Sequence, residues 1–349
     1  MPVYEVDPLR DARWTEFLQV QPLSSVFHTP GWLEALSDTY GYEVRALTTT
    51  QPSQPLKDSL VFCRVKSWLT GARAVSLPFS DHCQPLVDNS ADLAELVGFL
   101  REDVRSGNSK YCELRPVESL SADIGREMDL TESAAYCFHT LDLRPNLDEI
   151  CRGFHKSCAQ RQVRRAEREG LVVRKGRSEA ELAMFYSLLL LTRRRHQLPP
   201  QPLAWFRNLI RTFRDGLLIR IALKNGCPIA SILTLAHKKS IVYKYGCSDS
   251  TFHNLGGMPF LFWHAIRDAK ENGAEEFDLG RSDLDNPGLI SFKNNWGGTQ
   301  RKLVYYRHPA ASSEAAAKYP RMHAARRVFS ALPDFCLTTA GRLLYRHIG

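Results

Sequence analysis

A glycine pair at the start of a predicted helix is the feature of this chain that most directly suggests chemistry. The sequence Asn254-Leu-Gly-Gly257 ends a polar loop, and the amphipathic segment after it is predicted to be helical. Backbone N–H groups in the first turn of a helix have no partner within the helix, and the helix dipole favours an anion at this end. We therefore expect Asn254, Gly256 and Gly257 to hold a phosphate group of a donor substrate.

The whole chain has a net charge of +8, and its basic residues are concentrated in one short stretch. Between His155 and Arg168 they recur at three- and four-residue spacing, which stacks them on one face of a predicted helix. Such a face either recognises a polyanion or is a solvated surface, and the two interpretations start with equal weight. A second basic group, Arg193 to Arg195, ends the next predicted helix and favours a polyanionic ligand, whether nucleotide, coenzyme or RNA. The stretch contains Arg152, Lys156, Arg161, Arg164, Arg165, Arg168, Arg174, Lys175 and Arg177.

A third group of polar residues lies in the N-terminal half, between Pro78 and Pro85. Asp81 and His82 belong to an irregular loop between two apolar runs, and loops of this kind often carry binding residues. Together with Trp32 they are candidates for lining an acceptor pocket. His82 is interpreted as a loop residue rather than a general base, because no Ser or Cys nucleophile with an Asp partner is recognisable by spacing.

The composition is that of a large protein with a substantial hydrophobic core. The chain has 349 residues, of which 44% are apolar and 24% charged, and this length predicts two domains. Nine cysteines without a Cys-x-x-Cys pair are interpreted as reduced, mostly buried thiols. No His and Cys cluster has zinc-site spacing, so no metal is expected. Neither an eighteen-residue apolar run nor a basic and then apolar N-terminus is present, which predicts a cytoplasmic location.

The elements that must position these groups fall into two similar halves. Each half is predicted to open with helices and to continue with antiparallel strands, a helix and a further strand, which suggests a distant internal duplication. The Asn225-Gly226 pair predicts a hairpin inside a three-stranded meander of the second half, because both residues tolerate positive φ. The predicted helices cover 30–40, 92–106, 180–195 and 204–215, and the predicted strands 44–48, 59–65, 111–115, 217–223, 227–237 and 240–246.

The expected domain boundaries follow from this order of elements. Residues 1–148 form an N-terminal domain, and residues 149–308 form a C-terminal domain that begins with the basic helix. A linker is expected around 146–153. Beyond Pro309, an alanine-rich and basic tail over 309–349 is predicted to form one or two helices.

Five motifs, taken in order, resemble those of the FemABX-type peptidyltransferases in the GNAT acyltransferase superfamily. They are Phe27-His-Thr-Pro-Gly-Trp32, Phe154-His-Lys-Ser157 with Arg164-Arg-Ala-Glu-Arg168, Tyr243-Lys-Tyr-Gly246, Phe277-Asp-Leu-Gly280, and Phe292-Lys293 with Trp296-Gly297. The resemblance covers roughly residues 20 to 308, and the broad acetyltransferase-like branch is the nearest. It implies an α/β (α+β) fold of two tandem GNAT-like domains, each a mixed, largely antiparallel sheet flanked by helices. It also implies transfer of an acyl or aminoacyl group to an amine, with acyl-coenzyme A or aminoacyl-tRNA as the co-substrate and no tightly bound cofactor.

Two departures from the family pattern bear on the donor. The phosphate loop reads His253-Asn-Leu-Gly-Gly257 instead of the usual Gln/Arg-x-x-Gly-x-Gly/Ala, so the pyrophosphate cradle is partial. No sustained heptad pattern is present that would form a coiled-coil insertion for tRNA. Both donors therefore stay open, and with tRNA as donor the basic helix would have to hold it.

Acyl transfer to an amine needs oxyanion stabilisation, a route for the ammonium proton and precise positioning. Lys293 is the first candidate for a charged group near the reacting carbonyl or a donor phosphate, which the resemblance also implies; the alternative is a surface lysine beside a core Phe and Trp. Asp278 is the candidate proton acceptor, and the alternative is a cap of the following turn. Tyr243 and Tyr245 are expected on one face of a strand, and Tyr245 is the candidate donor to the leaving group. Arg281, in the loop after Asp278, joins the acceptor-binding candidates.

Three functional classes follow from these residues. The first is a FemAB-like N-acyltransferase acting on an amine of a cell-envelope or polysaccharide-related acceptor, with peripheral proximity to a membrane. Its narrower variant is an aminoacyl-tRNA-dependent enzyme that acts on a peptidoglycan precursor. The second class is a binding relative that has lost catalysis. DNA binding is the weakest, because neither a helix-turn-helix nor a zinc pattern accompanies the arginines.

Overall fold

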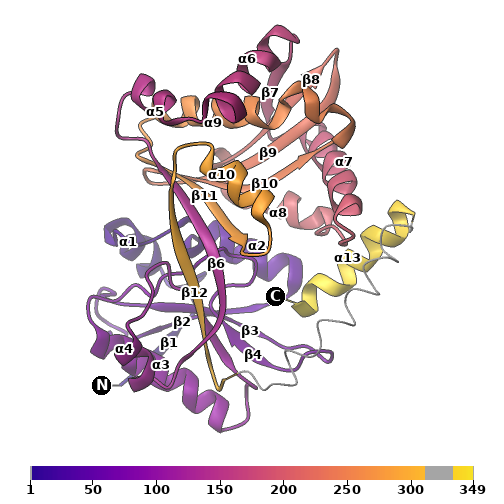
Figure 1. Cartoon of the computed structure of the whole chain (residues 1–349). Coiled ribbons are helices and arrows are strands. Elements are labelled where there is room, and N and C mark those ends of the chain that lie inside the picture. Colours follow the sequence, from indigo (N-terminus) through magenta and orange to yellow (C-terminus); the bar gives the residue numbers. More distant parts are fainter. Residues whose placement is uncertain (1, 311–332, 349) are drawn as a thin grey trace. The chain divides into compact units, whose positions relative to one another are not determined.

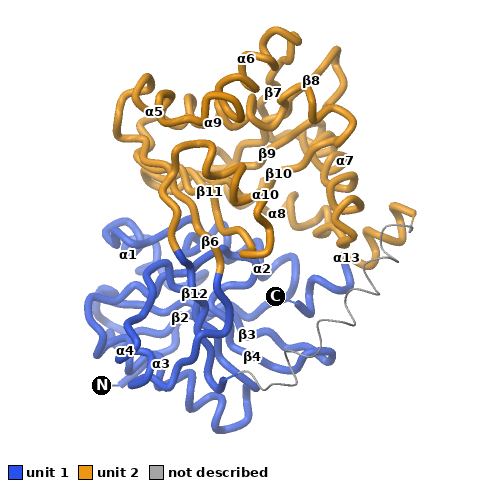
Figure 2. Tube along the Cα trace, viewed as in Figure 1, with its two compact units in different colours: residues 1–135, 302–321, 342–349 blue, residues 136–301, 322–341 orange. Residues whose placement is uncertain are grey.

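A computed structural model describes residues 2–310 and 333–348, which form two compact units (Figures 1 and 2). Of the described residues, unit 1 holds 2–135, 302–310 and 342–348, and unit 2 holds 136–301, inserted into the chain of unit 1, together with 333–341. The chain passes into unit 2 along strand β6, Thr131–Asp142, and returns along strand β12, Thr299–His308. The helical C-terminal segment α13, Asp334–Ile348, begins in unit 2 and ends in unit 1.

Unit 1 is a mixed sheet with helices, as the sequence predicts. Its strands pair in the order β1-β2-β3-β4-β5-β12, and every pair is antiparallel except β4 with β5. The Thr29-Pro30 pair starts helix α2, since the Thr29 hydroxyl accepts from the Trp32 N–H. The strands are β1 Tyr4–Val6, β2 Glu43–Thr48, β3 Leu60–Val65, β4 Arg73–Val75 and β5 Cys112–Leu114, and the helices are α1 Arg13–Val20, α2 Pro30–Tyr40, α3 Ser90–Arg105 and α4 Ala122–Glu127.

Unit 2 repeats this plan around strands in the order β6-β11-β10-β9-β8-β7. The predicted meander is confirmed as β8, β9 and β10, and Asn225 and Gly226 turn the hairpin with φ of 50° and 80°. The remaining pairs are antiparallel except β10 with β11. The strands are β7 Val172–Gly176, β8 Leu217–Lys224, β9 Cys227–His237, β10 Ser240–Ser248 and β11 Glu276–Asp283, and the helices are α5 Leu147–Gly153, α6 Arg161–Arg168, α7 Glu179–Arg195, α8 Leu203–Phe213, α9 Gly257–Glu271 and α10 Pro287–Asn294.

Two expectations about connections differ from the structure. The segment over 146–153, expected to be a linker, is helix α5 of unit 2, because Asn146 and Glu149 form a capping box and Ile150 is buried. The chain first passes from unit 1 to unit 2 between residues 135 and 136, inside strand β6, whereas the sequence places the boundary near 148. Of the tail, α13 is helical, and residues 311–332 lie outside the described chain. No helix among the described residues is long and apolar enough to cross a membrane.

The cysteines are free thiols, and five of the nine are buried. Burial raises the pKa of the Cys83 thiol to about 12 and that of Cys247 still further. A thiolate is therefore strongly disfavoured at both positions, which supports the interpretation of these thiols as structural.

Candidate active site

The parallel pair of strands in unit 2 separates shortly after it forms. Ladder pairs join β10 to β11 at Ser240, Ile241 and Val242, opposite Glu276, Phe277 and Asp278, and among the described residues none follows. Both strands nevertheless continue, β10 to Ser248 on its β9 side and β11 to Asp283 on its β6 side. Beyond Asp278, β10 and β11 thus form no ladder pair with each other in the described chain, and separated strand edges are the kind of backbone to which an extended ligand can bind.

A β-bulge lies on each strand where the two separate. On β10, Tyr243 pairs with Thr234 and Tyr245 with Leu233, so Lys244 is the extra residue. Thr234 and Leu233 are consecutive, and consecutive residues of a strand point to opposite faces. The expectation that Tyr243 and Tyr245 share one face is therefore wrong, because the bulge shifts the alternation by one residue.

The ring contacts agree with this register. Tyr243 packs edge-on against Phe262 of α9, with ring centroids 4.6 Å apart. Tyr245 packs against Phe206 of α8 at 5.1 Å, and its hydroxyl accepts a hydrogen bond from Trp205 Nε1 at 2.8 Å. This bond fixes the position of the phenol oxygen, which accepts here and belongs to a hydroxyl that can also donate.

Asp278 is buried at the bulge of β11, where Leu279 is the extra residue. Its carboxylate accepts a hydrogen bond from the Gly280 N–H at 2.6 Å, and Gly280 has a φ of 73°. The turn-capping role considered from the sequence is thus present. Asp278 pairs with Val242 of β10, and Val242 pairs with Leu235 of β9, so these three side chains lie on one face of the sheet. Tyr245 pairs with Leu233, two residues from Leu235, and therefore lies on that same face.

Lys293 on α10 is buried rather than a surface residue. Its Nζ donates to the carbonyl oxygens of Gly280 at 2.9 Å and Arg281 at 2.8 Å. The lysine therefore ties α10 to the part of β11 that follows the bulge, and it places a cationic group beside the strand opening.

His139 is a buried group at this place that the sequence reasoning missed. It pairs with Gly280 on the neighbouring strand, and its Nε2 lies 2.9 Å from Asn294 Oδ1. Burial lowers the pKa of His139, and the positive charge of Lys293 lowers it further, so the ring is neutral near pH 7. Only the long-range pairing of β6 with β11 brings His139 here, and no short motif indicates such pairing.

The glycine pair begins α9 as predicted, and close packing accounts for both glycines. Gly256 has a φ of 77°, and a Cβ there would come within 2.6 Å of the Gln162 carbonyl oxygen of α6. A Cβ on Gly257 would meet the side chains of Ala230 and Ile229. The basic helix thus lies directly against the start of α9, while Asn254 next to it is exposed.

The basic face of α6 points away from the hydrophobic core. Val163 and Ala166 are buried against the rest of unit 2, whereas Arg161, Arg164 and Arg168 are exposed. The structure therefore places these arginines on the helix that contacts Gly256. Their role in donor binding stays a prediction.

The acceptor candidates belong to different units. In unit 1, Trp32 is fully buried and packs edge-on against Phe27, as does His82. The Asp81 carbonyl accepts from the Tyr305 hydroxyl at 2.6 Å. In unit 2, the Arg281 guanidinium lies over the Tyr136 ring at 4.1 Å. Trp32 is thus a core residue in this structure, and acceptor binding by these four side chains stays a prediction.

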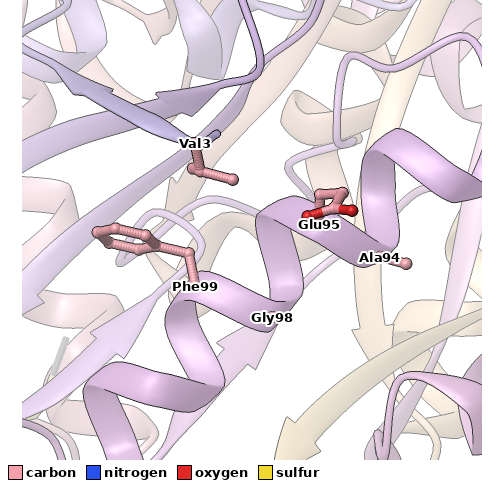
Figure 3. Close-up of a pocket in the computed structure, with 5 residues that line it drawn as sticks. All are labelled: Val3, Ala94, Glu95, Gly98 and Phe99. Atoms are coloured by element: carbon pink, nitrogen blue, oxygen red, sulfur yellow. The ribbon is translucent and has the colours of Figure 1, made fainter. Parts of the chain in front are cut away.

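A hollow on the surface of unit 1 contains none of the candidate residues. It lies beside helix α3 and is lined by Val3, Ala94, Glu95, Gly98 and Phe99 (Figure 3). Among the described residues, no group of three or more His, Cys, Asp or Glu side chains could hold a metal ion.

Comparison with known families identifies the second half of the chain. Residues 155–293 match the sequence model of the acetyltransferase (GNAT) domain. This part of the chain is therefore similar to a GNAT-type acetyltransferase domain. The match spans the basic helix, the strand opening and Lys293, and it confirms the expectation of a GNAT-type acyltransferase. No curated protein matches the chain significantly.

Solved structures with the same fold cover nearly the whole chain. FemX superposes with a TM-score of 0.70 at 14% identity, over 91% of this chain and 99% of FemX. A tandem GNAT protein from the clavulanic acid biosynthesis pathway gives 0.56 at 12% identity, over 89% and 99%. L-PGS from Bacillus licheniformis gives 0.51 at 11% identity, over 78% and 86%. These similarities confirm the predicted tandem GNAT-like fold.

Proposed function

We propose that this protein is a FemAB-like N-acyltransferase that moves an acyl group from acyl-coenzyme A to an amine of a cell-envelope or polysaccharide-related acceptor. The observation that carries the proposal is the separation of β10 from β11, with Tyr245 and Asp278 on one face of the sheet where it begins. Extended acyl and amide chains can pair with strand edges as an added strand does. The likeness to FemX supports the envelope-related acceptor, and the cytoplasmic location predicted from the sequence stays part of the proposal.

The donor is proposed to lie with its phosphates at the start of α9. The Gly257 end of the helix supplies N–H groups and a positive dipole end, and Arg164 and Arg168 on α6 supply cationic side chains. The thioester would then reach the opening between β10 and β11. Of the two donors considered from the sequence, coenzyme A fits this arrangement, because its phosphates and its extended amide chain each find a matching surface.

The reaction is a substitution at the thioester carbonyl. The acceptor amine attacks the carbonyl carbon, a C–N bond forms, and the C–S bond to coenzyme A breaks. Asp278 takes the proton that the amine loses, and the Tyr245 O–H donates to the leaving thiolate. Lys293 holds the Gly280 and Arg281 carbonyls and stabilises negative charge that develops at the reacting oxygen.

Calorimetric titration with acetyl-coenzyme A, repeated at higher salt, tests the donor. Saturable binding that persists at higher salt supports the proposal, whereas purely electrostatic binding to α6 would weaken steeply. A variant with Arg164→Gln and Arg168→Gln is expected to bind acetyl-coenzyme A more weakly. Arg126→Gln, an exposed arginine on α4 of unit 1, is the matched control and should bind like the parent protein.

The same titration, combined with a turnover assay, separates the remaining alternatives. No saturable binding of acetyl-coenzyme A would contradict the proposed donor and would direct the search to aminoacyl-tRNA. Binding without turnover of any amine offered would identify a non-catalytic relative. The acceptor is then sought by the loss of the thioester in the presence of candidate amines.

A further inference from the structure

Unit 1 presents a group of exposed apolar side chains that the proposed reaction does not use. The turn between β3 and β4 carries Trp68, 86% exposed, and Leu69, 53% exposed. The end of α13 carries Leu343 and Ile348, which are 62% and 55% exposed. Large apolar residues exposed together on one surface mark an interaction site more often than residues scattered singly.

A ring contact and hydrogen bonds hold these two segments together as one surface. The His347 ring packs edge-on against Trp68 with centroids 5.6 Å apart, and its Nδ1 lies 3.1 Å from the Ser67 hydroxyl. The His347 carbonyl oxygen accepts from the Thr70 hydroxyl at 3.0 Å and from the buried Arg73 at 2.9 Å. The turn is thus fastened to the last turn of α13. Leu343 lies four residues before His347 and therefore on the same side of the helix.

Basic side chains surround this apolar surface. Arg342 and Arg346 are exposed on α13 and follow each other at helical spacing beside Leu343. Lys66 precedes the turn with a side chain 78% exposed, although its Nζ lies 3.9 Å from Glu43. The exposed Lys110 lies against Gly71 at the end of the turn.

We propose that Trp68, Leu69, Leu343 and Ile348 form a docking surface that inserts into the headgroup region of an anionic lipid bilayer. The exposed Trp suits this depth, because its ring is apolar and its indole N–H can meet polar headgroups. The four cations suit anionic lipid, which attracts basic residues near a membrane surface. The same cations oppose docking of a second copy of this surface on itself, since like charges would face each other. The inference is independent of the proposed function, because the surface contains none of the proposed catalytic residues.

Sedimentation with vesicles tests the docking. The full chain is mixed with vesicles of phosphatidylcholine alone or of phosphatidylcholine with phosphatidylglycerol. Binding is expected only to the second kind and should fall as salt is raised. The emission of Trp68 should also shift to shorter wavelength on those vesicles, and the shift should be absent in Trp68→Phe.

Variants separate the apolar and the charged parts of the surface. Trp68→Ser with Leu69→Ser is expected to weaken vesicle binding about tenfold or more, because the inserted apolar area is lost. Replacing Arg342 and Arg346 by Gln should weaken it about fivefold per residue. Val20→Ser on α1, which removes a side chain 76% exposed on another element of unit 1, is the matched control and should bind unchanged.

Three results would overturn the proposal. The first is a lack of binding to both kinds of vesicle. The second is binding that the serine variant leaves unchanged. The third is a concentration-dependent dimer that the serine variant abolishes, because the surface would then join two copies of the chain. Binding of acetyl-coenzyme A by the serine variant is measured in parallel, so that a loss of donor binding can be distinguished from a loss of vesicle binding.

Discussion

At the residue scale, Asp278 has two roles that one substitution can separate. Asp278→Asn keeps an oxygen that accepts from the Gly280 N–H but removes the charge that would take the proton from the amine. We expect turnover to fall by about 10²- to 10³-fold, the range for loss of a general base, with stability changed little. Steady-state kinetics and urea unfolding check this. Unchanged turnover would reduce Asp278 to a cap of the bulge.

The role of Lys293 has to be tested by measuring stability and turnover separately, because removing its side chain disturbs the fold as well as the site. In Lys293→Ala the buried Gly280 carbonyl and the half-buried Arg281 carbonyl lose their donor, and the loss at the buried Gly280 carbonyl is expected to cost about 1–3 kcal/mol in the free energy of unfolding. Urea unfolding measures that cost, and turnover measured under conditions where the variant is folded measures the rest. Lys239→Ala, an exposed lysine paired with Glu275, is the control and should change neither. A fully active and stable Lys293→Ala would contradict both roles.

At the element scale, the contact between α6 and the start of α9 links a structural requirement to donor binding. Gly256→Ala meets the Gln162 carbonyl at 2.6 Å and also places alanine at a φ of 77°. Gly273 has the same φ with open space around it, so Gly273→Ala carries the backbone cost alone, about 1–2 kcal/mol. We expect Gly256→Ala to be less stable than this control and to bind acetyl-coenzyme A more weakly. Thermal unfolding and calorimetry check this, and equal behaviour of the two variants would remove α6 from the donor site.

The elements also show how far periodicity carries a prediction. Helix α2 and the Asn225-Gly226 hairpin were predictable because local signals, a Thr-Pro cap and two residues tolerant of positive φ, decide them. The faces of Tyr243 and Tyr245 were not, because a bulge is decided by the pairing of β10 with β9 and adds one residue without a local signal. The position of His139 was not predictable for the same reason, because it depends on the pairing of β6 with β11. In this chain, local chemistry predicts elements, and strand pairing decides which side chains meet.

At the scale of the whole molecule, the chain is two units of which one is inserted into the other through strands β6 and β12. A boundary near 148 is natural from sequence, since the basic helix follows it. The structure gives strand β6 to both units, because residues 136–142 pair with β11 of unit 2. The second unit therefore begins inside a strand, where composition does not change.

This arrangement predicts how fragments of unit 2 behave. A fragment over 136–301 retains the β6 residues that pair with β11 from Glu276 to Asp283. A fragment over 149–308 lacks these residues, so the β6 side of β11 is left unpaired, and the buried Leu141 and Leu143 are lost. We expect the first to unfold cooperatively in urea and to protect its β11 amides from hydrogen exchange, and the second to be less stable, with β11 exchanging rapidly. Both fragments lack α13, and they differ in β6, in the start of α5 and in residues 302–308 of β12. Equal stability and equal protection of β11 would mean that the second unit does not depend on the strand it shares.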